Sequence, residues 1–192
     1  CDVSGSMSRY SRMLLHFMHV LTTLRNDVHT FLFGTRLTNV TRFLRFKDVD
    51  EALAATSSAV EDWSGGTRIG DCLKEFNFNW SRRVLGPGAI VLFITDGLDR
   101  GGGIGLSKQI KLIQKSSKRL IWLNPFLRYE EFAPKPTVVK AILPHVDEFR
   151  PIHSLESMDQ LVNALSETNL QSRFNMAPWL EKLSEIENAQ YH

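Results

Sequence analysis

The residues best suited to chemistry in this sequence are aspartates and hydroxyl side chains at three separate places. The first is an Asp-x-Ser-x-Ser pattern, in which Asp2, Ser4 and Ser6 alternate on a short loop that contains a glycine. The others are Thr67, which follows two glycines, and Asp96, which precedes one. Alternating oxygens on a tight loop can turn toward one point, as the ligands of a hard cation do. Taken singly, each residue is explained better as a helix cap or a turn residue.

The elements that must position these residues alternate between strands and helices, which is typical of an α/β domain with a mainly parallel sheet. The clearest strand is 89–95, a nearly apolar run of the kind that helices cover on both faces. Other strands are predicted at 28–33, 37–43, 119–123 and 148–152, and helices at 7–24, 48–61, 68–83, 106–118, 138–143 and 157–165. Loops after parallel strands gather at one edge of the sheet. Asp2 and Asp96 would each end a strand and Thr67 would begin a helix, so the five oxygens would meet there.

The length of 192 residues suits about one domain. We expect it over residues 1–165, as a Rossmann-like, doubly wound and mainly parallel sheet flanked by helices. The remainder, 166–192, is predicted to be a tail with a short amphipathic segment at 179–183. An α/β domain normally begins with a buried strand, whereas here the first loop already comes at residue 2. We therefore expect the first central strand to be truncated at the N-terminus.

Composition and charge exclude several classes of protein. Hydrophobic residues form 43% and charged residues 23% of the chain, close to the average of globular proteins. The formal net charge of +2 is too small to predict binding to nucleic acid. Two cysteines cannot form a disulfide scaffold, and no apolar run reaches the ~18 residues that a membrane span needs. Because no signal peptide is visible either, we expect a cytoplasmic protein.

Two other patterns have a simpler explanation than chemistry. His16 and His19 lie three residues apart on a predicted helix, but they lack a third ligand and share a polar stripe with Arg12 and Thr23. That arrangement favours a solvated face over a metal site. The glycine-rich run 101–105 has neither the GxGxxG nor the Walker A spacing, so we expect a flexible lip rather than a nucleotide-binding loop.

Together, the three oxygen-bearing patterns resemble the metal-ion-dependent adhesion site of von Willebrand factor A (VWA) domains. The resemblance rests on Asp2-Val3-Ser4-Gly5-Ser6-Met7, Gly65-Gly66-Thr67 and Thr95-Asp96-Gly97, and it runs from Cys1 to about Leu165. It implies the VWA fold and a metal site in which Ser4, Ser6 and Thr67 bind the ion directly. Asp2 and Asp96 would then act largely through water. Mg²⁺ is the expected ion, with Mn²⁺ or Ca²⁺ as alternatives.

A finer resemblance is to the CoxE-like branch of these proteins. It rests on Thr95-Asp96-Gly97-Leu98-Asp99-Arg100-Gly101, on Trp122-Leu123-Asn124-Pro125 and on Ala141-Ile142-Leu143-Pro144-His145-Val146-Asp147. In that branch the domain works beside a MoxR-type AAA+ ATPase, and some members help to mature a molybdenum-containing carbon monoxide dehydrogenase. The resemblance implies a metal-dependent protein-interaction module whose partner supplies an acidic residue to the metal. The expected partners are such an ATPase and a client metalloenzyme.

The alternative is a metal-dependent hydrolase or phosphotransferase that uses Asp2 or a serine. The first loop resembles the DxDx[TV] pattern of aspartyl-nucleophile enzymes of the haloacid dehalogenase type, but Ser4 stands where the second aspartate would be. No GxSxG elbow is present for a serine hydrolase. Nothing in the sequence places His145 or His153 near Ser4. We therefore expect a binding module rather than an enzyme.

Overall fold

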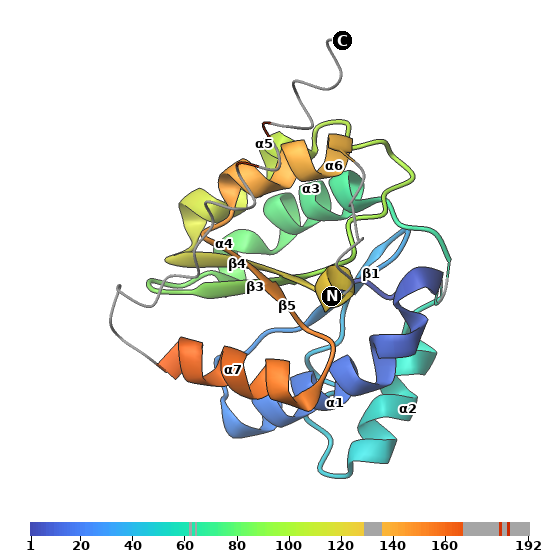
Figure 1. Cartoon of the computed structure of the whole chain (residues 1–192). Helices are drawn as coiled ribbons and strands as arrows, with labels where there is room; N and C mark the ends of the chain where they lie inside the picture. Colours follow the sequence, from blue (N-terminus) through green and yellow to red (C-terminus); the bar gives the residue numbers. More distant parts are fainter. Residues whose placement is uncertain (62, 64, 129–135, 167–180, 182–183, 185–192) are drawn as a thin grey trace.

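The computed structural model describes residues 1–61, 63, 65–128, 136–166, 181 and 184. Its centre is a parallel sheet with the strand order β3 (Ile90–Ile94), β4 (Arg119–Asn124), β5 (Glu148–Pro151). Figure 1 shows helices on both faces of this sheet. One face carries α3 (Ile69–Asn79), α5 (Leu106–Ser116) and α6 (Pro136–Ile142), and the other carries α1 (Ser8–Leu24), α2 (Val49–Ala59) and α7 (Leu155–Ser166). The predicted α/β class with a parallel sheet is confirmed.

Shorter elements complete the fold. They are the antiparallel strands β1 (Phe31–Phe33) and β2 (Leu37–Asn39), the helix α4 (Ser81–Val84), and the 3₁₀ turns η1 (Gly5–Met7), η2 (Pro125–Arg128) and η3 (Leu143–His145). Most of the tail predicted at 166–192, including the core of its amphipathic segment, lies outside the described residues, so the boundary at 165 stays a prediction. In the described part of the chain, every helix is too short or too polar to cross a membrane.

The strand β4 lies in the middle of the parallel sheet and is its most deeply buried strand. Leu120–Asn124 are all buried, and their largely apolar sequence suits a strand that helices cover on both faces. Both neighbours pair with β4 in parallel. The three strands therefore point the same way, and the loops that follow them open at one edge, which we call the carboxyl edge.

The segment Cys1–Val3 lies between β1 and β3. The Asp2 amide donates a hydrogen bond to the Ile94 carbonyl (2.8 Å), and Asp2 also forms an isolated parallel bridge with Phe33. On the far side of Phe33, β1 pairs with β2. Residue 2 thus joins the two sheets, at the point where the sequence predicts a central strand to end.

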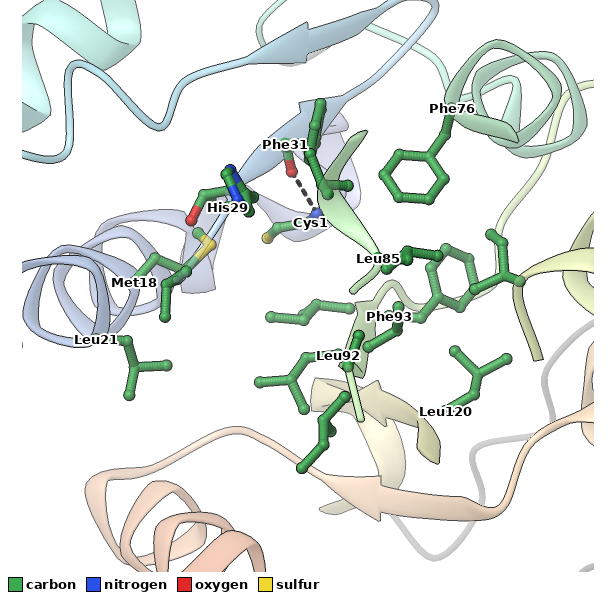
Figure 2. Close-up of a pocket in the computed structure, with 18 of the residues that line it drawn as sticks. Cys1, Met18, Leu21, His29, Phe31, Phe76, Leu85, Leu92, Phe93 and Leu120 are labelled. Atoms are coloured by element: carbon green, nitrogen blue, oxygen red, sulfur yellow. Dashed lines mark hydrogen bonds between the residues drawn. The ribbon is translucent and has the colours of Figure 1, made fainter. Parts of the chain in front are cut away.

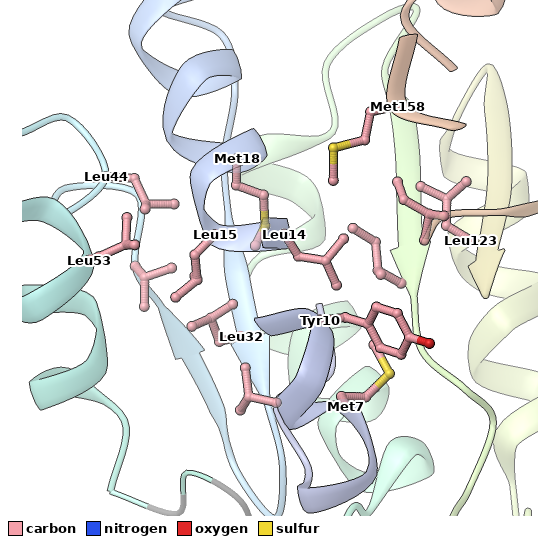
Figure 3. Packing of buried hydrophobic residues seen from close by; sticks show 14 of the residues in the cluster. Met7, Tyr10, Leu14, Leu15, Met18, Leu32, Leu44, Leu53, Leu123 and Met158 are labelled. Carbon is pink, nitrogen blue, oxygen red and sulfur yellow. The ribbon is translucent and has the colours of Figure 1, made fainter. Parts of the chain in front are cut away.

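Two hydrophobic clusters, one on each face of the central sheet, hold the layers together. The first contains Leu14 from α1, Leu123 from β4 and Met158 from α7 (Figure 3). The second is built around Trp122 and Phe149, whose ring centroids lie 4.3 Å apart, and it extends into α3, α5 and α6. Because apolar side chains fill both faces, the ends of the strands are held firmly, and so are the loops that begin there.

The helix predicted at 68–83 is interrupted. Helix α3 ends at Asn79 and α4 begins at Ser81, because Trp80 departs from helical backbone with φ −122° and ψ −37°. The Trp80 ring packs edge-on against Phe31, with centroids 5.2 Å apart. Contact with a distant strand thus overrides the local helical pattern.

The solvated face predicted for both histidines of α1 is correct only for His16. His19 is buried, and its Nδ1 lies 3.0 Å from the carbonyl oxygen of Leu44. The turn at residues 41–45 covers this side of α1 and supplies the polar partner that a buried imidazole needs. His19 therefore has a structural role.

An apolar cavity of about 650 Å³ lies between β3 and β1. Figure 2 shows Met18, Leu21, Phe31 and Leu92 around it, with the Cys1 nitrogen donating a hydrogen bond to the Phe31 carbonyl (2.7 Å). The sheet around residues 1–3 is thus closed at the carboxyl edge and open at the opposite edge.

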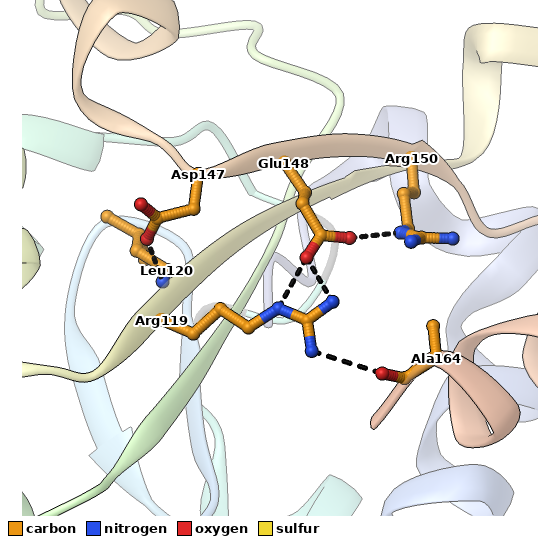
Figure 4. A network of polar contacts seen from close by, with 6 residues as sticks. All are labelled: Arg119, Leu120, Asp147, Glu148, Arg150 and Ala164. Atoms are coloured by element: carbon orange, nitrogen blue, oxygen red, sulfur yellow. Dashed lines mark hydrogen bonds and ion pairs between the residues drawn. The ribbon is translucent and has the colours of Figure 1, made fainter. Parts of the chain in front are cut away.

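A buried carboxylate ties the sheet to α7. Glu148, which is fully buried in β5, accepts hydrogen bonds from the guanidinium groups of Arg119 and Arg150 (Figure 4). Arg119 also donates to the carbonyl of Ala164 in the last turn of α7 (3.1 Å). Because one acidic side chain satisfies two arginines, the network fixes β4, β5 and α7 relative to one another.

Candidate metal site at the carboxyl edge

Asp2 is at the centre of a hydrogen-bond network that joins three loops. Its carboxylate is fully buried, and Oδ1 accepts hydrogen bonds from the Ser4 amide (2.8 Å) and the Thr67 hydroxyl (3.5 Å). The other oxygen, Oδ2, accepts the hydroxyl of Thr95 (2.7 Å). Thr67 lies 65 residues from Asp2 along the chain, and Thr95 lies 93 residues away. The fold therefore brings together residues that are far apart in sequence.

The two serines of the first loop turn their hydroxyls toward each other. The Oγ atoms of Ser4 and Ser6 lie 3.2 Å apart, with Ser4 buried and Ser6 half-buried. The Gly5 amide donates to the Gly65 carbonyl (3.3 Å), which holds this loop against the loop that carries Thr67. Hydroxyls from both loops thus lie at one place on the carboxyl edge.

Asp96 brings a second carboxylate from the end of β3. Its Oδ1 accepts the amide of Leu98 (2.8 Å), in the turn that leads away from the strand. Its Oδ2 is buried and has no hydrogen-bond partner among the described residues. An anionic oxygen buried without a donor is costly. A bound cation would remove that cost, so the donor atoms at this edge fit the kind of ion that the sequence predicts.

Burial raises the pKa of both carboxyl groups above the ordinary aspartate value. For Asp2, loss of solvent is the largest cause, and hydrogen bonds from Ser4 and Thr95 lower the pKa in part. For Asp96, loss of solvent is again the largest cause, the nearby Ser6 hydroxyl and the hydrogen bond from the Leu98 amide oppose it, and the charge of Asp2 adds to it. Two carboxylates so placed favour a cation between them.

Residues at the ends of β3 and β4 support the site, and sequence reasoning missed their roles. The Trp122 indole donates to the Thr95 carbonyl (3.0 Å), and the Asn124 side-chain amide donates to the Asp96 carbonyl (3.3 Å). These bonds fix the backbone on which Asp96 is carried. A usable signal existed, because Thr95 and Asn124 are the polar residues that end two apolar strands.

The glycine-rich loop after Asp96 is tied to the site rather than loose. The carboxylate of Asp99 is buried and accepts the amides of Ile69 (2.9 Å) and Gly103 (2.8 Å). The first bond joins the loop to the start of α3, directly after the Thr67 loop. The sequence predicts only a flexible lip here, because the glycines at 101–103 give no sign that Asp99 anchors the loop.

The histidines of the described residues lie away from the serines of the first loop. In the described part of the chain, no histidine hydrogen-bonds to Asp2, Ser4 or Ser6, and His145 instead lies 2.8 Å from the Ser107 hydroxyl. No group of three or more His, Cys, Asp or Glu side chains is placed to hold a metal among the described residues. A cation at the carboxyl edge would therefore depend on hydroxyl ligands as well as on the two carboxylates.

Comparison with known families agrees with this geometry. The model of the family described as VWA domain containing CoxE-like protein matches residues 1–158, a range that includes every predicted metal ligand. No curated protein matches the chain. Because the family match extends over most of the 192 residues, the chain belongs to the VWA domain-containing, CoxE-like family.

Proposed function

We propose that this chain is a protein-interaction module whose binding depends on a divalent cation, most simply Mg²⁺. The hydroxyls of Ser4, Ser6 and Thr67 would bind the ion, and the carboxylates of Asp2 and Asp96 would act behind them, largely through water. The observation that carries the proposal is the buried Oδ2 of Asp96, which has no hydrogen-bond donor within the described part of the chain, in a site that already gathers three hydroxyls. Mn²⁺ or Ca²⁺ would suit the same oxygen ligands.

Such a site binds a partner rather than transforming a substrate. Three neutral hydroxyls leave the cation able to accept a further anionic ligand, and a carboxylate from a partner supplies one. Ser6 is half-buried, so the hydroxyl side of the site is open to solvent, whereas both aspartates are fully buried. The partner would therefore meet the cation on the hydroxyl side.

Family membership supports a role in systems related to carbon monoxide dehydrogenase. We infer that the partners are a MoxR-type AAA+ ATPase and a client metalloenzyme, and that the protein works in the cytoplasm. One of these proteins would supply the acidic residue, while the other would bind a different face.

Thermal unfolding with and without Mg²⁺ tests the metal site. The melting temperature of the wild type should rise with Mg²⁺, and Asp2→Ala should abolish the rise. Because Asp2 also supports the apo fold through Ser4 and Thr95, Thr67→Ala is the second variant, and it should reduce the rise. Asp159→Ala, at an exposed position of α7, is the matched control and should keep it. An unchanged rise in Asp2→Ala would place the ion elsewhere.

Pull-down of the candidate ATPase and client tests the interaction itself. Binding of at least one of them should require Mg²⁺, disappear in EDTA and weaken in Thr67→Ala. Full binding of both proteins in EDTA would contradict the proposed function. Loss of one alone would identify the partner that supplies the carboxylate.

A further inference from the structure

An arginine side chain lies on the loop that carries Thr67. A β-carbon at position 66 would come within 2.0 Å of the Arg100 Nε atom and 2.3 Å of its Cζ atom, so the guanidinium rests directly on the Gly66 backbone. The Arg100 amide also donates to the carbonyl of Thr67 (2.9 Å). Both the main chain and the side chain of Arg100 are therefore placed beside a proposed metal ligand.

This placement is built into the loop. Asp99, the preceding residue, accepts backbone amides from Ile69 and from Gly103 with its two carboxylate oxygens. The loop is thus fixed on both sides of Arg100 before any partner arrives. Because Gly66 lacks a side chain, the guanidinium can approach the site more closely than any other residue at position 66 would allow.

The charge of Arg100 is not compensated locally. Its side chain is exposed, and in the described part of the chain it forms no ion pair and no side-chain hydrogen bond. The carboxylates of Asp2 and Asp96 together balance the charge of one divalent ion. A loaded site is therefore formally neutral as a whole, although the cation can still accept an anionic ligand on its open side. Arg100 adds a positive charge beside the cation, which attracts a second acidic group.

We propose that Arg100 is a specificity-determining residue, and that the partner presents two neighbouring carboxylates, one for the cation and one for the guanidinium. The inference rests on the proposed function, since the first carboxylate needs the bound ion. A guanidinium binds a carboxylate through two parallel hydrogen bonds, which a lysine ammonium cannot reproduce. Partners with a single acidic residue would bind less tightly, so the pair of sites distinguishes between acidic surfaces.

The test uses small dicarboxylates as probes, with saturating Mg²⁺ and NMR titration of the labelled chain. Succinate, glutarate and adipate are each compared with the corresponding monoamide, which has the same length but only one carboxylate. For at least one length, the wild type should bind the diacid about three- to tenfold more tightly than its monoamide. Arg100→Gln should reduce that ratio to about two, the statistical advantage of having two equivalent ends.

Two further variants separate position from charge. Gly66→Ala keeps the arginine but forces its side chain away from the site. The ratio of diacid affinity to monoamide affinity should therefore fall toward the value for Arg100→Gln. Arg82→Gln removes the same charge from α4, before β3 and away from the carboxyl edge, and should bind as the wild type does. All variants should keep the Mg²⁺-dependent rise in melting temperature.

The possible failures are distinguishable. If Mg²⁺ does not raise the melting temperature of the wild type, the proposed function fails, and the role of Arg100 fails with it. If Mg²⁺ stabilises the wild type but the wild type shows no preference for any diacid, only the inference about Arg100 is overturned. A preference that survives in Arg100→Gln would overturn it equally.

Discussion

Asp2 and Asp96 are buried where an uncompensated negative charge is unfavourable, and burial raises the pKa of both carboxyl groups. In the metal-free protein they therefore retain protons at a pH at which the unfolded chain has lost them. The native state binds more protons than the unfolded state over that range, so the free energy of unfolding falls as the pH rises through the raised pKa values. Below the unfolded pKa, both states are protonated and the effect disappears.

The effect of pH on metal-free stability can be isolated with Asp96→Asn. The asparagine side chain keeps an oxygen that can accept a hydrogen bond from the Leu98 amide, but it cannot ionise. The free energy of unfolding of the variant should therefore lack the pH dependence that ionisation of Asp96 causes. In EDTA, the stability of the wild type relative to this variant should fall as the pH rises above the ordinary aspartate pKa, by about 1.4 kcal/mol for each unit by which folding raises the pKa of Asp96. Urea unfolding of both proteins measures the difference. Parallel pH curves for the two proteins would contradict it.

At the scale of helices and strands, the sequence was most informative where the pattern was local. The run at 89–95 is apolar and bounded by glycines and an Asp-Gly turn, and it forms β3 as predicted. The three oxygen-bearing loops were also predictable, because each follows or precedes such an element. The break at Trp80 was not, since it depends on a ring contact with Phe31, 49 positions earlier in the chain. The contact of the Arg100 side chain with Gly66 was not predictable either, because it joins two loops and no pattern in the neighbouring sequence indicates it.

The contact between the sheet and α7 gives a prediction at this same scale. Glu148→Gln should destabilise the fold by about 3 kcal/mol, because it removes the buried negative charge that pairs with both Arg119 and Arg150 in the network of Figure 4. Chemical unfolding measures the change, and the exposed Glu156→Gln on α7 is the control. Equal stability of the two variants would show that the arginines find other partners in solvent.

At the scale of the whole molecule, the cavity between β1 and β3 interrupts the sheet (Figure 2). An extended apolar segment added before Cys1 would lie between two strand edges and cover Leu92 and Phe31. We expect it to raise the melting temperature, and a net gain of about 2 kcal/mol would correspond to roughly 4–8 °C. A glycine–serine extension of equal length is the control. An equal effect of both extensions would show that the cavity is not a site for a strand.

The hydrogen bond between Asp2 and Thr95 spans 93 residues, so the two residues are synthesised at clearly different times. At a synthesis rate of about 5–20 residues per second, Thr95 leaves the ribosome roughly 5–20 s after Asp2. Throughout that interval the first loop has neither the hydroxyl nor the second carboxylate with which it later works. Contacts of such high sequence separation form late in folding, because the entropy of closing the long loop must be overcome first. Affinity for the cation would then be acquired in one late step, so that partly made chains would not compete with finished ones for the partner.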